Sequence, residues 1–262
     1  MSDVWVTLEQ VEAGVHRLRI ERERALNALN ADVLDQIEAA LDRVEAEESS
    51  RVLIVTGQGT KAFVAGADIE AISRFDNQAA ARAFAARGQR LFQRFEESSI
   101  ITIAAINGYA LGGGLELAMA LDLRIAAHSA RLGQPEINLG IIPGFGGTQR
   151  LSRLVGPGQA LWMISSGEPV TAEEAKALGL VDMVVPADTL MDECLRRAHI
   201  LAEKAPLALA ASKRLVMGSR DWTLESGLNQ EAEAFSRLAV SADGREGTQA
   251  FLEKRPPKFQ GR

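Results

Sequence analysis

Hydrophobic and polar residues follow two different periods near the start of the chain. Residues 15–23 (VHRLRIERE) alternate between apolar and polar side chains, as a half-buried strand does. The next segment carries Leu34, Ile37 and Leu41 at helical spacing. Asn30 precedes this segment as a candidate N-cap. The pattern therefore predicts a strand followed by an amphipathic helix.

Two continuous apolar runs predict fully buried strands, RVLIVTG at 51–57 and IITIAAING at 100–108. The first leads through the loop GQGTKAFVAGAD (57–68) into a helical region that extends to about Ser98. The second leads into LGGGLELAMALD (111–122), where a helix opens. Strands that alternate with helices predict an α/β fold, and their spacing indicates repeated strand–strand–helix units.

Helical patterns dominate after about Gly167. Thr171 is a candidate N-cap, with Glu173 following it in the manner of a capping box. Two longer helical patterns follow and are broken near Pro206. We expect residues 1–200 to form the core and residues 201–262 to form a helical module for oligomerisation and cover of the functional site. No linker rich in Gly, Pro or Ser separates the two parts, so the module should pack on the core.

Composition narrows the class of protein. The chain has 262 residues, of which 47% are hydrophobic and 24% charged, as in ordinary globular proteins. Its formal net charge is −6 and its basic residues are scattered, which does not favour a nucleic-acid partner. No charge-free apolar run is long enough to span a membrane, and the N-terminus lacks the apolar stretch of a signal peptide. We therefore expect a soluble cytoplasmic protein with no membrane partner.

Thiol and metal chemistry receive little support from the sequence. The single cysteine, Cys194, excludes a disulfide within the chain and favours a reducing compartment. No histidine adjoins it, so we do not expect it to be catalytic. His16, His128 and His199 lie far apart and lack the spacing of metal ligands, so no metal site is expected.

Nucleotide-binding and hydrolase motifs are also absent or incomplete. The sequence contains no Walker A loop, no G-x-S-x-G and no H-E-x-x-H motif. Residues 57–62 (GQGTKA) half resemble a dinucleotide fingerprint, but FVAGAD follows where the fingerprint requires a helix to open at once.

Two loops share a feature that can serve chemistry. In FVAGADI (63–69) and LGGGLEL (111–117), small residues lie after a strand and before a helix, where backbone N–H groups have no ladder partner. Two such groups that converge on one point would form an oxyanion hole, assisted by the helix dipole. The alternative is that the glycines only turn the chain or let the helix pack closely.

Two glutamates lie near these loops in sequence. Glu116 follows Gly113 by three residues, so on a helix that starts there its carboxylate is one turn along on the same face. Glu136 lies in a segment with few other charges, and its alternative is an ordinary exposed loop residue. Two carboxylates beside one oxyanion hole would form a general acid/base pair suited to proton transfer next to a carbonyl.

Six motifs, in order, resemble the enoyl-CoA hydratase/isomerase (crotonase) family and cover nearly the whole chain. They are ALNAL at 25–29, AFVAGADI at 62–69, NGYALGGGLELA at 107–118, QPEINLGIIPGFGGTQRL at 134–151, AKALGLVD at 175–182 and FLEKRPPKF at 251–259. The resemblance implies a spiral of ββα units with C-terminal helices. It also implies a homo-oligomer, either a trimer or a dimer of trimers.

The resemblance also implies a set of catalytic roles. The N–H groups of Ala67 and Gly113 would hold the thioester oxygen. Glu116 would position and activate water, Glu136 would act mainly as the acid that protonates the α-carbon, and the backbone of Gly144 would help to hold the water. The implied reaction is hydration of a trans-2-enoyl-CoA to a 3-hydroxyacyl-CoA, with no cofactor other than the coenzyme A of the substrate.

Coenzyme A contacts are implied for residues in or near the first two motifs and for two residues from a neighbouring subunit. The first group is Ala25, Ala28, Ala65, Asp68 and Ile69, and the second is Phe251 and Lys254. Glu70 stands where some members have lysine, so Lys254 or Arg24 would have to supply charge for a phosphate.

Two other functions are compatible with the resemblance. A double-bond isomerase of the same family generally needs one carboxylate, so the presence of both glutamates favours hydration. A non-catalytic RNA-binding homologue would need a basic surface, which this acidic chain lacks. The sequence leaves the acyl chain length open. It also leaves open whether the pathway is fatty-acid β-oxidation or another degradation route.

Overall fold

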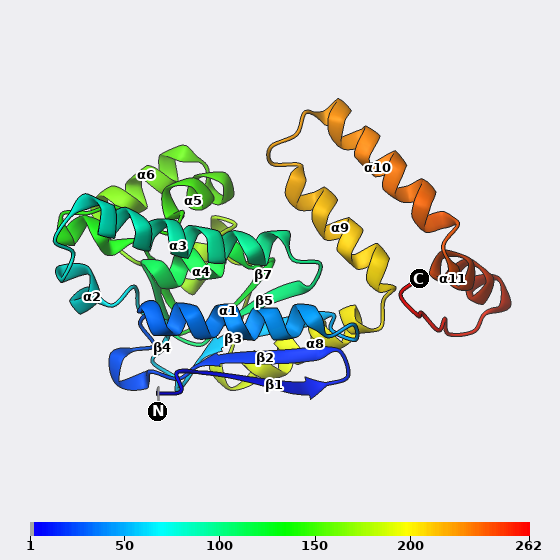
Figure 1. Cartoon of the computed structure of the whole chain (residues 1–262), viewed down its shortest axis with the longest axis horizontal. Helices are drawn as coiled ribbons and strands as arrows, with labels where there is room; N and C mark the ends of the chain where they lie inside the picture. Colours follow the sequence, from blue (N-terminus) through cyan, green and yellow to red (C-terminus); the bar gives the residue numbers. More distant parts are fainter. Residues whose placement is uncertain (1–2) are drawn as a thin grey trace.

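The strands of this computed structural model, which describes residues 3–262, form two sheets (Figure 1). Met1 and Ser2, at the start of the predicted core, lie outside the described residues. The larger sheet has the order β1-β2-β3-β5-β7-β10 and is parallel except for the β1–β2 pair. Its strands are Val6–Glu12, Val15–Ile20, Val52–Gly57, Ile101–Ile106, Leu123–Ala127 and Met183–Val185.

The smaller sheet has the order β4-β6-β8-β9, with only β8 and β9 antiparallel. Its strands are β4 Ala62–Val64, β6 Tyr109–Leu111, β8 Arg131–Gly133 and β9 Val170–Thr171. Three times in succession, one strand enters the larger sheet and the next enters the smaller one, in the pairs β3/β4, β5/β6 and β7/β8. This arrangement confirms the predicted spiral of ββα units.

Helices follow these strand pairs. Those of the core are α1 Ala31–Ala46, α2 Ile69–Ser73, α3 Gln78–Glu97, α4 Gly113–Ala120, α5 Gly147–Val155, α6 Pro157–Ser166, α7 Ala172–Ala177 and α8 Leu190–Ala202. The helix predicted after Asn30 is confirmed as α1. Its predicted N-cap is confirmed too, because the Asn30 side chain accepts from Val33 N at 2.9 Å. The predicted capping box at Thr171 is present, but Glu174 closes it instead of Glu173, because only the third helical residue reaches back to the cap.

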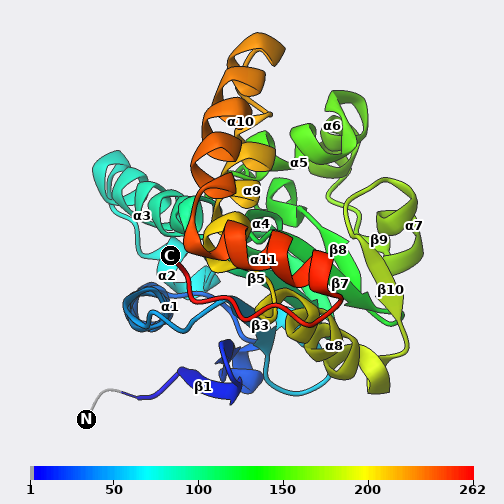
Figure 2. The same ribbon diagram turned by 90° about the vertical axis from the view of Figure 1, so that its right-hand side faces the viewer.

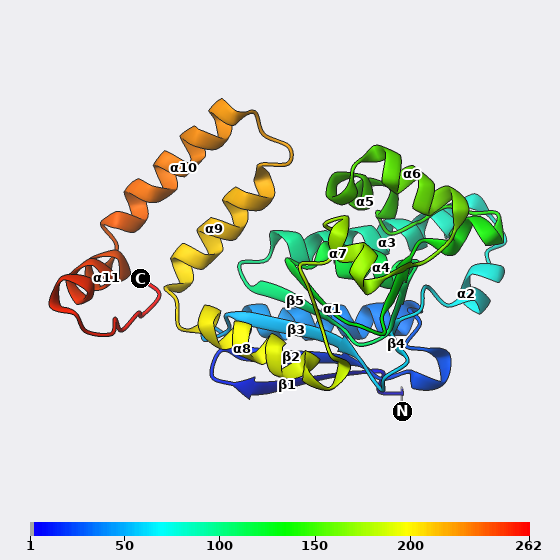
Figure 3. The ribbon, with the colours of Figure 1, turned by 180° about the vertical axis from the view of Figure 1, so that it is seen from behind.

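The buried strands carry apolar side chains on both faces because both faces are covered. In β3, Leu53 and Val55 belong to the main core with α1, α3 and α4, whereas Val52 and Ile54 pack in a second cluster. The second cluster includes Cys194 of α8, which lies in front of the larger sheet in the view of Figure 3. Burial on both faces explains the continuous apolar runs in the sequence.

The C-terminal module consists of α9 Pro206–Gly218, α10 Leu224–Ala239 and α11 Ala242–Glu253, which confirms its predicted helical character. It projects from the core: α10 packs on α9 and α11 on α10 (Figure 1). Viewed from that end, α11 and the last residues lie nearest the viewer, in front of the core (Figure 2). The expected packing on the core is therefore made mainly by α9. No helix within residues 3–262 is both long and apolar enough to cross a membrane.

Candidate active site

Glycines at the start of α4 have distinct steric roles. Gly112, the N-cap, has φ +50° and ψ −125°, a backbone conformation that is essentially restricted to glycine. A Cβ on Gly114 would overlap the carbonyl oxygen of Val64 in β4, so glycine is required for the close packing of strand and helix. The tight turn and the close packing considered from the sequence are therefore both present, and together they fix the position of Gly113.

Glu116 lies in the first turn of α4 and is only 1% exposed. Its Oε1 accepts from the N–H groups of Phe145 and Gly147, both at 2.7 Å. Burial, followed by the nearby charge of Glu136, raises the pKa of Glu116 to about 8, although the two backbone hydrogen bonds and Arg150 act in the opposite direction. The carboxylate that looked isolated in the sequence is thus bound by a loop from another unit of the spiral.

Glu136 lies in the short 3-10 helix Pro135–Leu139 and is partly buried, so it is not an ordinary exposed loop residue. Burial raises its pKa to about 7. The amide nitrogen of Gln134, when turned toward Glu136, lies 3.0 Å from both carboxylate oxygens. A Cβ on Gly112 would lie 2.8 Å from Glu136 Oε1, so glycine leaves room for this carboxylate beside the start of α4.

Two backbone N–H groups without protein acceptors lie beside these carboxylates. Within residues 3–262, neither the Ala67 nor the Gly113 N–H donates a hydrogen bond to the protein. The two residues are adjacent in space, because a Cβ built on Gly113 would lie 3.3 Å from Ala67 N. Hydrogen-bond donors with this placement are able to bind an oxygen that develops negative charge.

One cavity of about 250 Å³ brings these groups together. All five predicted catalytic residues line it: Ala67, Gly113, Glu116, Glu136 and Gly144. Ala65 and Ile69, predicted to contact coenzyme A, line it too. Much of the remaining wall is apolar and is formed by Ile72, Phe75, Ala81, Phe84, Ala85, Leu139, Ile141 and Ile142.

The other residues predicted to contact coenzyme A from this chain lie in two neighbouring segments. Leu29 N donates to Gly66 O at 2.9 Å and Asp68 N donates to Leu29 O at 2.8 Å, so ALNAL runs beside AGADI. Ala25 is exposed, and the carbonyl of Ala28 accepts from Arg22 at 2.6 Å.

Asp68 has two local structural contacts. Its side chain caps α2, and it pairs with Arg22 at 3.0 Å. Sequence reasoning missed Asn27, whose buried amide donates to the carbonyls of Gln58 and Ala62 and holds the ALNAL loop in place.

Phe251 and Lys254 do not line the cavity of their own chain. Phe251 is exposed on α11, and Lys254 is the exposed C-cap of that helix. In Figure 1, α11 and α2 lie at opposite ends of the molecule. The sequence-based assignment placed these two residues in the site of a neighbouring subunit.

Backbone donors, the single thiol and metal-binding side chains can each be compared with what the sequence predicted. Phe145 and Gly147 were missed, because they act through backbone N–H groups that no residue type signals. Burial raises the pKa of the Cys194 thiol to about 12, which agrees with a non-catalytic role. Among residues 3–262, no group of three or more His, Cys, Asp or Glu side chains is placed to hold a metal ion.

The chain is similar to known proteins in both sequence and structure. Residues 10–262 match a family model described as Enoyl-CoA hydratase/isomerase. The chain is 44% identical to the crotonyl-CoA hydratase of Syntrophomonas wolfei over 92% of this chain and 93% of that protein. It is 42% identical to the 2,3-dehydroadipyl-CoA hydratase of Escherichia coli over 100% of both. A crystal structure of an enoyl-CoA hydratase from Bacillus anthracis matches with a TM-score of 0.95 at 38% identity, covering 99% of this chain and 100% of that chain.

Proposed function

The chain belongs to the enoyl-CoA hydratase/isomerase family, and we propose that it adds water to a trans-2-enoyl-CoA to give a 3-hydroxyacyl-CoA. The observation that carries this proposal is the meeting of a buried carboxyl group, a partly buried one and two unpaired backbone N–H groups at one cavity. Addition of water to a polarised double bond needs an anion site, a base and an acid, and these four groups supply them.

The thioester oxygen is held by the N–H groups of Ala67 and Gly113. As water attacks the β-carbon, negative charge collects on this oxygen in an enolate-like transition state. The two donors and the N-terminus of α4 stabilise that charge. Loss of one such donor typically costs about 3–4 kcal/mol of transition-state stabilisation.

Glu116 and Glu136 hold one proton between them near neutral pH, because burial raises the pKa of both. These pKa values place the shared proton mainly on Glu116, so hydration proceeds through the less populated arrangement of the pair. In that arrangement ionised Glu116 takes a proton from the attacking water and protonated Glu136 delivers one to the α-carbon. Gly144 lines the cavity beside them and helps to hold the water. We propose that the reaction needs no cofactor, because the two N–H donors would polarise the thioester and the two glutamates would transfer the protons.

The test is hydration of crotonyl-CoA by the wild type and by Glu116→Gln and Glu136→Gln. Each variant should lose most of its turnover and retain its fold and its binding of the CoA ester, because amides preserve shape but remove the acid/base function. Near wild-type turnover in either variant would refute the paired-carboxylate mechanism. A parallel assay with a 3-enoyl-CoA separates the isomerase alternative, since isomerisation without hydration would overturn the proposal.

The residues that line the cavity also favour substrates with an apolar acyl chain. No Lys or Arg occurs among the described residues that line it, and its outer wall is mainly aliphatic and aromatic. A substrate with a carboxylate at the end of its acyl chain would bring a charge into this apolar environment without a partner. We therefore expect kcat/KM for crotonyl-CoA to exceed that for 2,3-dehydroadipyl-CoA by at least about tenfold. Equal values for the two substrates would exclude an apolar acyl preference.

Coenzyme A would lie against the adjoining ALNAL and AGADI segments, with Ala25, Ala28, Ala65, Asp68 and Ile69 nearby. We assign Phe251 and Lys254 to the site of a neighbouring subunit in a homo-oligomer, a trimer or a dimer of trimers. The projection of α10 and α11 from the core supports this assignment, because it leaves both residues exposed and distant from their own cavity.

A further inference from the structure

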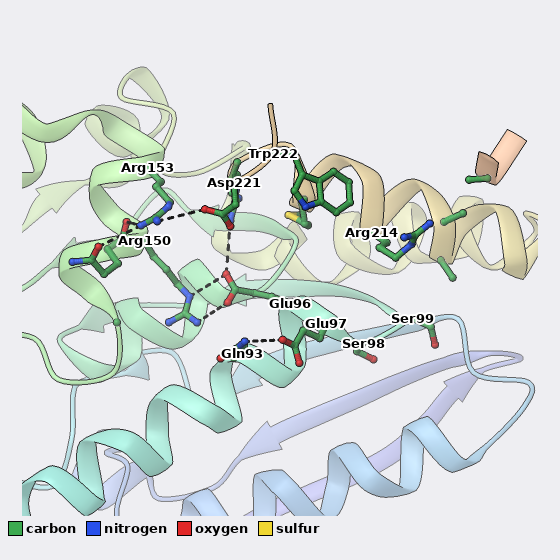
Figure 4. Close-up of a pocket in the computed structure, with 18 of the residues that line it drawn as sticks. Gln93, Glu96, Glu97, Ser98, Ser99, Arg150, Arg153, Arg214, Asp221 and Trp222 are labelled. Carbon is green, nitrogen blue, oxygen red and sulfur yellow. Dashed lines mark hydrogen bonds and ion pairs between the residues drawn. The ribbon is translucent and has the colours of Figure 1, made fainter. Parts of the chain in front are cut away.

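Arg150, on α5, connects the loop around Glu116 to a second and larger cavity. This cavity, of about 1220 Å³, lies between α3, α5 and the α9–α10 pair (Figure 4). Arg150 Nε and one terminal nitrogen donate to Glu96 at 3.1 and 2.6 Å, and the other terminal nitrogen donates to Phe145 O at 2.9 Å. The arginine side chain is 12% exposed. Such a forked arrangement fixes a guanidinium group more rigidly than a single contact would.

Arg150 donates to the same loop, residues 144–147, whose N–H groups bind the Glu116 carboxylate. The N–H groups of Phe145 and Gly147 donate to the Glu116 carboxylate, and Arg150 donates to the carbonyl oxygen of Phe145. Gly146, between Phe145 and Gly147 in the chain, has φ +110°, and a Cβ there would overlap the Arg150 guanidinium. The loop conformation and the place of the arginine therefore depend on each other.

Helix α3 supports the same loop at a second point. Gln89 Nε2 donates to Gly144 O at 2.8 Å, which is the carbonyl of the peptide whose N–H, from Phe145, donates to Glu116. Glu96, the partner of Arg150, lies two helical turns further along α3. Glu96 Oε1 also lies 3.7 Å from a terminal nitrogen of Arg220, between α9 and α10.

Charge acts together with this geometry. The charged groups that act on Glu116 are Glu136, from the 3-10 helix, and Arg150, from α5. The charged group that faces Arg150 is Glu96 from α3, and Glu96 in turn faces Arg220, which lies beyond α9. Arg150 lowers the pKa of Glu116, against the larger effects of burial and Glu136. Within the same cavity, Arg153 pairs with Asp221 at 3.6 Å.

We propose that Arg150 is a positioning residue for the hydration reaction, which holds the Gly144–Gly147 loop in the geometry that binds the Glu116 carboxylate. This inference rests on the proposed function. Arg150 does not line the substrate cavity, so it acts through the loop and not through contact with the substrate. Its partner Glu96 also pairs with Arg220, and this links the same loop to the C-terminal module.

The test compares Arg150→Met with Arg153→Met. Methionine keeps much of the side-chain length but removes the charge and the donors. For Arg150→Met we expect kcat to fall by about 100-fold, as for a small misplacement of a catalytic group, with KM changed less than about threefold. The kcat profile should move to higher pH, because Glu116 loses a positive neighbour and its pKa rises. Arg153→Met should match the wild type in kcat and in pH profile.

A measurement independent of turnover separates this inference from the proposed function. Titration of ¹³C-carboxyl-labelled protein by NMR, with Glu116 identified by its loss in Glu116→Gln, should show a higher Glu116 pKa in Arg150→Met. Arg150→Lys keeps the charge but cannot bridge Phe145 O and both Glu96 oxygens. Its Glu116 pKa should stay close to that of the wild type, and its kcat should fall between those of the wild type and the methionine variant.

The outcomes are distinct. If the wild type fails to hydrate any enoyl-CoA, the proposed function fails, and the NMR titration still decides the role of Arg150. An unchanged kcat and an unchanged Glu116 pKa in Arg150→Met would overturn the inference, as would a lower kcat with no shift in pKa or pH profile. If Arg150→Met fails to fold, Arg150→Lys decides, and a wild-type kcat in that folded variant would refute the positioning role.

Discussion

Glu116 at the residue scale shows the cost of keeping a carboxyl group in an apolar helix. Its pKa is raised to about 8 from an ordinary value of 4.5, so the folded state favours the neutral form. Stability from this group is fully present below the unfolded-state pKa and is lost as pH rises through the folded-state value. The protein should therefore lose stability as the pH rises from mildly acidic to mildly alkaline values.

This titration gives a test by unfolding. Glu116→Gln cannot ionise, so relative to the wild type it should gain a few kcal/mol in unfolding free energy as pH rises from about 5 to about 9, at about 1.4 kcal/mol per unit of pKa shift. Denaturant unfolding at several pH values measures the difference. Glu97→Gln, on the exposed end of α3, is the matched control and should follow the wild type. Parallel curves for the wild type and Glu116→Gln would contradict the raised pKa.

Gly112 provides a second prediction at this scale. Gly112→Ala should cost about 1–3 kcal/mol in unfolding free energy, because alanine tolerates this backbone conformation poorly. Its Cβ would also press on Glu136, so turnover should fall as well. Gly158→Ala, in α6 with open space around it, should leave stability unchanged or raise it slightly. Equal stability of the two variants would show that Gly112 is not strained.

The sequence predicted half of the Glu116 environment. A lone carboxylate in an apolar helix needs partners, and its spacing from Gly113 placed it beside the free N–H groups. Its actual donors, Phe145 and Gly147, could not be found from residue types, because every non-proline residue offers the same N–H group. The role of Asn27 was hidden for a different reason, since only the folded chain brings Gln58 O and Ala62 O to its amide.

At the scale of elements, long periodic segments were predicted and very short ones were not. The buried runs of β3 and β5 and the amphipathic α1 have enough residues for their period to be visible. The strands β4 and β6 have three residues each, and a period of two cannot be recognised in three positions. The residues of β4 had been predicted as part of a loop and those of β6 had been assigned to no strand, although the two strands place Ala67 and Gly113 at the cavity.

Helix α9 joins the C-terminal module to the core through one buried ion pair. Lys213 Nζ lies 2.8 Å from Asp122 Oδ2 and also donates to the carbonyls of Phe95 and Ile100 at 2.6 and 2.8 Å. Asp122 Oδ2 accepts from Thr102 N and Oγ1 at 2.7 and 2.9 Å. This network ties the C-terminal module to the ends of α3, β5 and α4.

Removal of Lys213 alone should therefore lower the unfolding free energy far more than removal of both Lys213 and Asp122. Lys213→Met would leave a buried carboxylate unpaired, which costs about 3–5 kcal/mol. The double variant Lys213→Met/Asp122→Leu should recover most of this loss, and Lys204→Met, on an exposed site, should have little effect. Thermal and denaturant unfolding measure all three variants. A Lys213→Met protein as stable as the wild type would show that the pair does not anchor the module.

At the scale of the whole molecule, the projecting module exposes large apolar side chains. Leu228 and Phe235 on α10 are exposed, as are Phe251 and Leu252 on α11. Large exposed apolar side chains on one module favour contact with another protein surface. They are consistent with the homo-oligomer proposed above, in which α11 reaches a neighbouring site.

The oligomer can be tested with Phe235, which is 71% exposed. Phe235→Glu should shift the protein toward smaller species in sedimentation velocity, because it places a charge in the proposed subunit contact. Val4→Glu introduces the same charge at an exposed apolar residue outside the module and should leave the distribution unchanged. A monomeric wild type would exclude the subunit arrangement.

The burial of Cys194 has a consequence for the compatibility of the protein with its own substrate. An enoyl thioester is an electrophile, and thiolates add readily to its β-carbon. The chain has one thiol, placed between the larger sheet and α8, and burial raises its pKa to about 12. At neutral pH it is neither ionised nor accessible. The protein is therefore protected from alkylation by the reactive alkene that it is proposed to process.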